Sequence, residues 1–193
     1  MRRRVAVVGA GIVGAAVARD LIRRLPDAEV TVFDKADHAA THQTGHNSGV
    51  VHAGLYYAPG SLKARLCRRG VDLLRAFCAD QGLPYVECGK VVVALNDEEL
   101  PRLHAIHERA LANGVPGAAL IGRRELAELE PNAIGLAAVH SPHTAIVDYP
   151  AITRALLDDV RAAGGRVRMG AEVRRVVPGA PGVTVETAAG SES

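Results

Sequence analysis

A glycine-rich turn near the start of the chain restricts the fold more than any other feature. Residues 9–14 read GAGIVG and follow a short apolar run, Arg4 to Val8, of the kind that forms a strand covered on both faces. Apolar residues then recur at helical spacing from Ile12 to Leu25, and Val30 to Phe33 predicts a second strand that Asp34 closes. A strand, a GxGxxG turn, a helix, a strand and an acid in this order predict a dinucleotide-binding α/β fold.

Each part of this motif has a physical role at a diphosphate. Gly9 permits the tight turn, Gly11 lets the backbone approach the pyrophosphate, and Gly14 lets helix and strand pack closely. The helix N-terminus offers free N–H groups and a partial positive charge to the phosphates. Asp34 is expected to accept hydrogen bonds from the ribose hydroxyls and to repel a 2′-phosphate, which disfavours NADP. The motif alone does not choose between NAD and FAD, because both present an adenosine diphosphate.

The composition is that of an ordinary globular chain. Of the 193 residues, 48% are apolar and 23% are charged, which argues against disorder. A net charge of +2, spread along the chain, and only 3% aromatic residues argue against a nucleic-acid partner. The basic start followed by an apolar run also resembles a secretory signal, but the spaced glycines and the charged segment behind them disfavour it. No apolar run is long enough for a membrane span.

The cysteines and histidines give no metal signature. Cys67, Cys78 and Cys88 contain no CxxC pair, so neither a structural zinc site nor a disulfide framework is expected. Cys67 and Cys78 lie on one helical stripe and are expected to be buried thiols in a reducing compartment. His104 and His107 have helical spacing but no third ligand, so no metal site is predicted.

The segment after Asp34 departs from the repeated strand–helix order. Residues 42–57 read HQTGHNSGVVHAGLYY, with three histidines, three glycines and no acidic residue. The glycines allow a close approach of the backbone to a ligand, and Thr44 and Ser48 add small hydroxyl groups. Such a segment suits the remainder of a long cofactor. Three histidines would then stand near the cofactor's chemistry: His42, His46 and His52.

The same segment carries a family resemblance. Residues 42–67, HQTGHNSGVVHAGLYYAPGSLKARLC, resemble the L-2-hydroxyglutarate oxidase/dehydrogenase family, which belongs to the D-amino-acid-oxidase-like FAD-dependent oxidoreductases. The similarity continues through FCADQGLPYVECGKVVVAL, ELAELEP and HSPHTAIVDYPAITRAL, and so covers essentially the whole chain. The acid that closes the second strand is often Glu in such proteins. Asp34 is one methylene shorter and suits the same role.

The resemblance implies FAD as the cofactor, bound at the turn and along the segment behind Asp34. In such proteins a later strand, here near Val173, passes the adenine. The implied cofactor-binding residues are Gly9, Ala10, Gly11, Ile12, Val13, Gly14, Asp34, Lys35, Gln43, Thr44, Asn47, Ser48, Gly49 and Val173. The implied reaction is hydride transfer from C2 of an (S)-2-hydroxy dicarboxylate to flavin N5, giving 2-oxoglutarate. Electrons would pass to oxygen or a quinone, in the cytoplasm or peripherally at the inner face of the membrane.

His52 is the candidate catalytic residue. It is expected to act as the general base on the substrate hydroxyl or as a covalent attachment point for the flavin, and the alternative is packing beneath the flavin ring. Tyr56 and Tyr57 suit either packing or hydrogen bonding to the substrate. Four basic residues form either a solvated face or a clamp for the distal carboxylate of the substrate: Lys63, Arg65, Arg68 and Arg69.

The remaining patterns predict a second, partial domain. Pro59 to Gln81 reads as a long helix with Leu62, Leu66, Leu73 and Phe77 on the cysteine stripe. A β-rich run, a polar helix and another amphipathic helix follow at Tyr85–Leu95, Asp97–Asn113 and Pro150–Ala163. The predicted division is an FAD-binding segment at 1–84, a partial substrate domain at 85–148 and a return to the FAD-binding domain at 149–193.

The end of the chain predicts an incomplete sheet. The alternating strand from Val183 to Thr187 is expected to lie on an unprotected edge, because the tail reads as a turn before an absent strand. The chain is therefore expected to be the N-terminal part of a longer enzyme. The alternatives are an amino-acid or glycerol-3-phosphate oxidase of the same superfamily, and a non-catalytic FAD-binding fragment that needs a partner chain.

Overall fold

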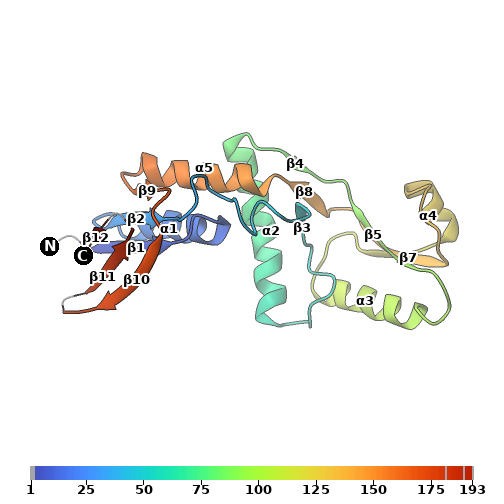
Figure 1. Ribbon diagram of the computed structural model, residues 1–193. Helices are drawn as coiled ribbons and strands as arrows, with labels where there is room; N and C mark the ends of the chain where they lie inside the picture. Colours follow the sequence, from blue (N-terminus) through green and yellow to red (C-terminus); the bar gives the residue numbers. More distant parts are fainter. Residues whose placement is uncertain (1–2, 181, 189, 193) are drawn as a thin grey trace. The chain divides into compact units, whose positions relative to one another are not determined.

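The computed structural model in Figure 1 describes residues 3–180, 182–188 and 190–192. The chain forms two compact units, one of Met1–Asn47 with Asp148–Ser193 and one of Ser48–Val147. The predicted α/β class is confirmed. The return of the chain at residue 148 lies within one residue of the predicted boundary. The predicted boundary at 84 differs from the structure, because residues 50–51 pair with residues 145–146 and so draw the segment after Asn47 into the second unit.

The first unit contains the predicted strand–helix–strand order. Its elements are β1 (Arg4–Val8), α1 (Ile12–Arg24), β2 (Glu29–Phe33), α5 (Tyr149–Ala162) and β9 (Arg166–Arg168). The three strands form a parallel sheet in the order β1-β2-β9. The middle strand is almost fully buried at Val30, Val32 and Phe33, as expected for a parallel strand covered on both faces. Strand β9 pairs with β2, so the chain returns to this sheet after α5.

Helix α1 buries a different face from the one that its largest side chains suggest. Val13 and Val17 are 74% and 44% exposed, whereas Ala15, Ala18 and Ile22 are buried. The alanines lie at helical spacing and have short side chains, so α1 can approach β2 and α5 closely. Size alone therefore misidentifies the packed face of this helix.

The last strands of the first unit form a separate antiparallel sheet. Strands β10 (Val173–Pro178), β11 (Val183–Thr187) and β12 (Gly190–Glu192) pair in the order β10-β11-β12. The prediction that Val183–Thr187 lies on an unprotected edge was wrong. The tail itself supplies the missing neighbour, because residues 190–192 fold back on β11 and the hydroxyl of Thr187 donates to the carbonyl of Gly190 at 2.9 Å.

The second unit is built around two small antiparallel sheets. Its strands are β3 (Val50–Val51), β4 (Tyr85–Val86), β5 (Lys90–Ala94), β6 (Ala119–Gly122), β7 (Ala137–Ser141) and β8 (Ala145–Val147). Its helices are α2 (Leu62–Gln81), α3 (Leu100–Ala112) and α4 (Arg123–Leu129). The sheet orders are β3-β8-β4 and β5-β7-β6, so β8 and β7 are the central strands.

Helix α2 starts three residues later than predicted. The side chain of Ser61 caps it by accepting a hydrogen bond from the N–H of Ala64, and Gly82 ends it in the left-handed conformation. The predicted apolar stripe was wrong in part, because the leucines at 62, 66 and 73 are 55–61% exposed. The buried side chains Ala64, Val71 and Cys78 are seven residues apart, and Val71 packs against Val51 of β3 and Ala145 of β8.

None of the helices within the described residues is both long and apolar enough to cross a membrane.

Candidate functional site

The glycine turn of the first unit has a geometry that other residues would disrupt. Gly9 has φ +107°, in the region that favours glycine, and its N–H donates to the carbonyl of Phe33 at 2.7 Å. A Cβ atom on Gly14 would lie 1.9 Å from the carbonyl oxygen of Gly9. The turn that ends β1 and the first turn of α1 are therefore in direct backbone contact, as the predicted role of the third glycine requires.

The N-terminus of α1 presents its amides around Gly11, which is the N-cap residue. The N–H of Ile12 donates to Oγ1 of Thr44 at 3.1 Å, so the HQTG segment reaches the start of this helix. The next two amides, on Val13 and Gly14, have no acceptor among the described residues, and the first turn carries no acidic side chain. These two N–H groups and the helix dipole suit a diphosphate.

Asp34 lies beside this turn at the end of β2. Its two carboxylate oxygens accept hydrogen bonds from the N–H groups of Ala10 at 2.6 Å and Ala36 at 2.9 Å. Each carboxylate oxygen can accept a second bond, so the group keeps capacity for ribose hydroxyls. The backbone carbonyl of Asp34 accepts from the N–H of Ala171 at 2.7 Å, which brings the segment just before Val173 alongside Asp34.

The segment after Thr44 is folded tightly by its own polar groups. The amide of Asn47 donates to the carbonyl of Thr44 at 2.6 Å. A Cβ on Gly45 would lie 2.4 Å from the carbonyl oxygen of Ala40, which itself adopts φ +64°. The side chains of Lys35, Gln43 and Ser48 are exposed and available to a ligand.

The predicted cofactor residues thus divide into two groups. Within the first unit the structure brings together the turn at 9–14, Asp34 and Thr44. Ser48 and Gly49 lie in the second unit, where Gly49 has φ +70° and its carbonyl accepts from the N–H of Val147 at 2.9 Å. The glycine geometry, the free helix amides and the anchored carboxylate fit the adenosine diphosphate end of FAD.

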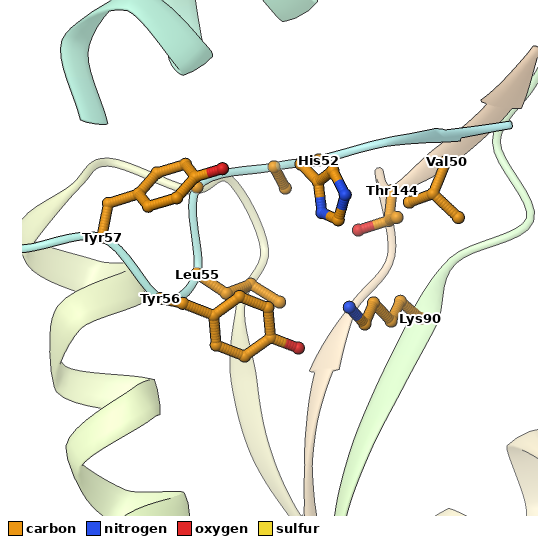
Figure 2. A pocket seen from close by; sticks show the side chains of 9 residues that line it. Val50, His52, Leu55, Tyr56, Tyr57, Lys90 and Thr144 are labelled. Atoms are coloured by element: carbon orange, nitrogen blue, oxygen red, sulfur yellow. The ribbon is translucent and has the colours of Figure 1, made fainter. Parts of the chain in front are cut away.

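His52 lines a small pocket within the second unit. Figure 2 shows Lys90, Thr144 and His52 around this pocket, with the ammonium group of Lys90 directed toward the ring of Tyr56. We call it the His52 pocket, and its lining residues are Val50, His52, Ala53, Gly54, Leu55, Tyr56, Tyr57, Lys90 and Thr144. Sequence reasoning selected His52 as the candidate catalytic residue and left Tyr56 and Tyr57 open between packing and substrate binding. It missed Lys90 and Thr144, which come from distant segments of the chain.

Three side chains hold the backbone of the segment that carries His52. The thiol of Cys67 donates to the carbonyl of His52 at 2.9 Å, and Nη1 of Arg68 donates to that of Ala53 at 3.3 Å. The amide of Asn113 donates to the carbonyls of Gly54 and Tyr57, both at 2.9 Å. No local sequence signal points to these contacts, because α2 and α3 meet the segment only in the folded chain.

Of the two thiols predicted to be buried, only Cys78 is fully so. Cys67 is half-buried, and Cys88 is exposed. Burial raises the pKa of the Cys67 thiol, with a smaller opposing effect from the Arg68 guanidinium. Cys67 therefore remains a protonated hydrogen-bond donor at neutral pH.

The basic residues of α2 differ in their surroundings. Arg68 lines a second cavity of about 200 Å³ together with Asp72, Arg75 and His143. Lys63, Arg65 and Arg69 are exposed, as expected for a solvated face. Of the four basic residues proposed for a carboxylate clamp, Arg68 is the one that lines this second cavity.

Within the described ranges, no three His, Cys, Asp or Glu side chains are grouped so as to hold a metal ion.

A parallel βαβ unit with a glycine turn, free helix amides and an acid after β2 defines a dinucleotide-binding α/β protein. A family model described as "DAO: FAD dependent oxidoreductase" matches residues 4–193, and the chain belongs to this family. It is 47% identical over 172 residues to the human mitochondrial L-2-hydroxyglutarate dehydrogenase, a match that covers 89% of this chain and 37% of the relative. Identity to the L-2-hydroxyglutarate dehydrogenase of Escherichia coli O17:K52:H18 is 42% over 186 residues, covering 96% of this chain and 44% of that protein.

Solved structures share the fold. The FAD-bound L-α-glycerophosphate oxidase of Mycoplasma pneumoniae has a TM-score of 0.87 at 24% identity, over 97% of this chain and 50% of its own. The glycine oxidase of Geobacillus kaustophilus has a TM-score of 0.86 at 23% identity, over 99% of this chain and 53% of its own. The chain thus spans about half the length of these structural neighbours and less than half the length of the two curated relatives.

Proposed function

We propose that this chain binds FAD and takes part in the oxidation of a 2-hydroxy acid, with L-2-hydroxyglutarate as the substrate and 2-oxoglutarate as the product. The hydrogen bond from the N–H of Ile12 to Thr44 carries the proposal. It joins the HQTGHNSG segment, which resembles the 2-hydroxyglutarate family, to the turn that suits the diphosphate of the cofactor. The relatives named L-2-hydroxyglutarate dehydrogenase support the choice of substrate.

The turn at 9–14, with Ala10, Ile12 and Val13, holds the diphosphate, while Asp34 and Lys35 hold the adenosine ribose. The backbone near Val173 lies against the adenine. Gln43, Thr44, Asn47, Ser48 and Gly49 contact the remaining length of the cofactor through amides and small polar groups. FAD, when bound, supplies the acceptor for the hydride that leaves C2 of the substrate.

His52 serves as the general base of the proposed reaction. Its imidazole takes the proton of the substrate hydroxyl while C2 loses hydride, so one proton and one hydride leave and a 2-oxo acid remains. The carbonyl of His52 is fixed by the thiol of Cys67, which restricts the main chain that carries the imidazole. Covalent attachment of the cofactor to His52 is a competing role, and it predicts flavin that stays with the protein on denaturation.

The absorbance spectrum of the purified protein tests the proposal. We expect flavin bands near one equivalent and their bleaching by (S)-2-hydroxyglutarate in the absence of oxygen. Bleaching by glycerol 3-phosphate or an amino acid instead would assign a different substrate. Flavin bands that no substrate bleaches would leave a binding module without this activity, and a protein unable to bind FAD would contradict both functions.

Replacement of His52 tests its role. His52→Gln should retain flavin and slow the bleaching by about 10²-fold or more, which is the usual contribution of a general base. His104→Gln, at an exposed position on α3, is the matched control and should bleach like the parent protein. Full turnover in the His52→Gln protein would remove this residue from the mechanism.

The acceptor of the electrons is proposed to be oxygen or a quinone. The protein itself is proposed to lie in the cytoplasm or at the inner face of the membrane. Hydrogen peroxide formed during turnover identifies the first acceptor. Turnover that depends on an added quinone, together with sedimentation of the protein with lipid vesicles, identifies the second.

A further inference from the structure

Lys90 is the one Lys, Arg, Asp or Glu among the residues that line the His52 pocket. The other lining side chains are apolar, aromatic or neutral polar, apart from the imidazole of His52. The pocket itself is only about 10 Å³ in volume, so a ligand would bind at its mouth. An ammonium group placed among such neighbours has lost part of its hydration, so an anion at the mouth is attracted more strongly than it would be at an open surface.

No carboxylate neutralises Lys90 in the part of the chain that the structure describes. Its Nζ atom lies 4.9 Å from the centre of the Tyr56 ring, and that ring is its partner. Arg75 and Arg124 of the same unit each pair with a glutamate, Glu87 and Glu128. The charge of Lys90 is therefore left for a ligand, while the aromatic contact keeps the side chain directed into the pocket (Figure 2).

The backbone of Lys90 is well fixed. Lys90 is the first residue of β5 and pairs with Ser141 of the central strand β7. The preceding Gly89 donates its N–H to the carbonyl of Thr144 at 2.9 Å, and the hydroxyl of Thr144 donates to that of Ser141 at 3.0 Å. Ser141 and Thr144 are both buried. A charged group on such a support can position a ligand without further ordering of the protein.

We propose that Lys90 binds a carboxylate of the substrate and that the His52 pocket selects carboxylate-bearing substrates by this charge. The inference rests on the proposed function and names the group that recognises its substrate class. A single cation with two tyrosines suits a monoanionic carboxylate.

Calorimetric titration of the FAD-loaded protein with 2-oxoglutarate, and separately with glutarate, tests Lys90 without requiring turnover. Lys90→Met should weaken the binding of both dianions at least tenfold, and Lys90→Arg should restore part of it. Lys63→Met is the matched control, because Lys63 stands 4.9 Å from the neighbouring Tyr57 ring but does not line the pocket. The Lys63→Met protein should bind 2-oxoglutarate and glutarate with an affinity within twofold of the parent protein. The flavin spectrum should be the same in all variants.

The outcomes separate this inference from the proposed function. If Lys90→Met binds 2-oxoglutarate as tightly as the parent protein, or if Lys63→Met loses as much, Lys90 does not bind the carboxylate. A parent protein that binds neither dianion also contradicts the inference. If Lys90-dependent binding is found but (S)-2-hydroxyglutarate does not bleach the flavin, the recognition stands and the redox function fails.

Discussion

Gly14 shows how a single residue is constrained in this chain. It belongs to the first turn of α1, where alanine would ordinarily be the better helix former. The carbonyl oxygen of Gly9 occupies the place of its missing Cβ, at 1.9 Å. Since that carbonyl belongs to the backbone of the turn, it cannot move without disturbing the amides at the start of the helix.

Gly14→Ala should therefore destabilise the protein by more than about 3 kcal/mol, or release FAD, because the strand and the helix must separate. Gly70→Ala is the matched change, in α2, where nothing lies within 4 Å of the added methyl group. It should stabilise the protein by about 0.5–1 kcal/mol. Urea denaturation of both variants measures the two effects. Equal effects would mean that the close contact at Gly14 is not a constraint.

At the scale of elements, α1 and α5 depend on each other. Both pack on the sheet of the first unit, and Asp159 of α5 forms ion pairs with Arg19 at 2.5 Å and Arg23 at 3.6 Å. The side chains of Arg19 and Asp159 are only 22% and 24% exposed. The contact joins residues 140 positions apart, so it ties the return of the chain to the glycine-turn segment.

Asp159→Asn should lower the free energy of unfolding by about 1 kcal/mol, since it weakens a partly buried pair between two helices. Asp158→Asn changes the adjacent residue, which forms an exposed pair with Arg161 inside one helix. That change should cost at most about 0.5 kcal/mol. Urea denaturation measures both, and the first difference should shrink at high salt. If the two variants lose equal stability, the ion pair to α1 contributes nothing specific.

At the scale of the whole molecule, pH provides a test of tertiary contacts. Glu87 follows β4 and accepts a hydrogen bond from His143, on the turn between β7 and β8, at 3.0 Å. It also pairs with Arg75 of α2. The hydrogen bond from His143 and the charge of Arg75 hold the pKa of Glu87 below its usual value. Glu87 thus joins a helix, a strand end and a turn of the second unit.

Because the pKa is lower in the folded chain, the stabilisation by Glu87 is present above the pKa of the unfolded chain, about 4.3. It is lost as the pH falls through the lower folded value. Glu87→Gln should reduce the urea midpoint at neutral pH. The difference in midpoint between this variant and the parent protein should narrow at about pH 3, below the pKa of an unperturbed glutamate. Glu128→Gln, in an exposed pair of α4, is the control. A Glu87→Gln deficit that is the same at both pH values would contradict the assignment.

Several elements were predictable because their patterns are local. The five residues of β1 were predicted with their observed bounds, and α1, β2, α3 and α5 lie within a few residues of prediction. Pro150 and the cap at Asp148 mark the start of α5 in the sequence itself. Strands β3 and β8 were not predicted, because two or three residues are too short for a periodic pattern.

The amino-acid sequence by itself determined the βαβ unit, the turn at Gly9–Gly14 and the placement of Asp34, because these depend on neighbours along the chain. Only the tertiary structure decided which face of α2 is buried, that β12 covers β11, and that Lys90 enters the pocket of His52. Those outcomes depend on contacts between segments far apart in the sequence. Side-chain spacing fixes which residues share a face, but the packing partner that covers that face exists only in the folded chain.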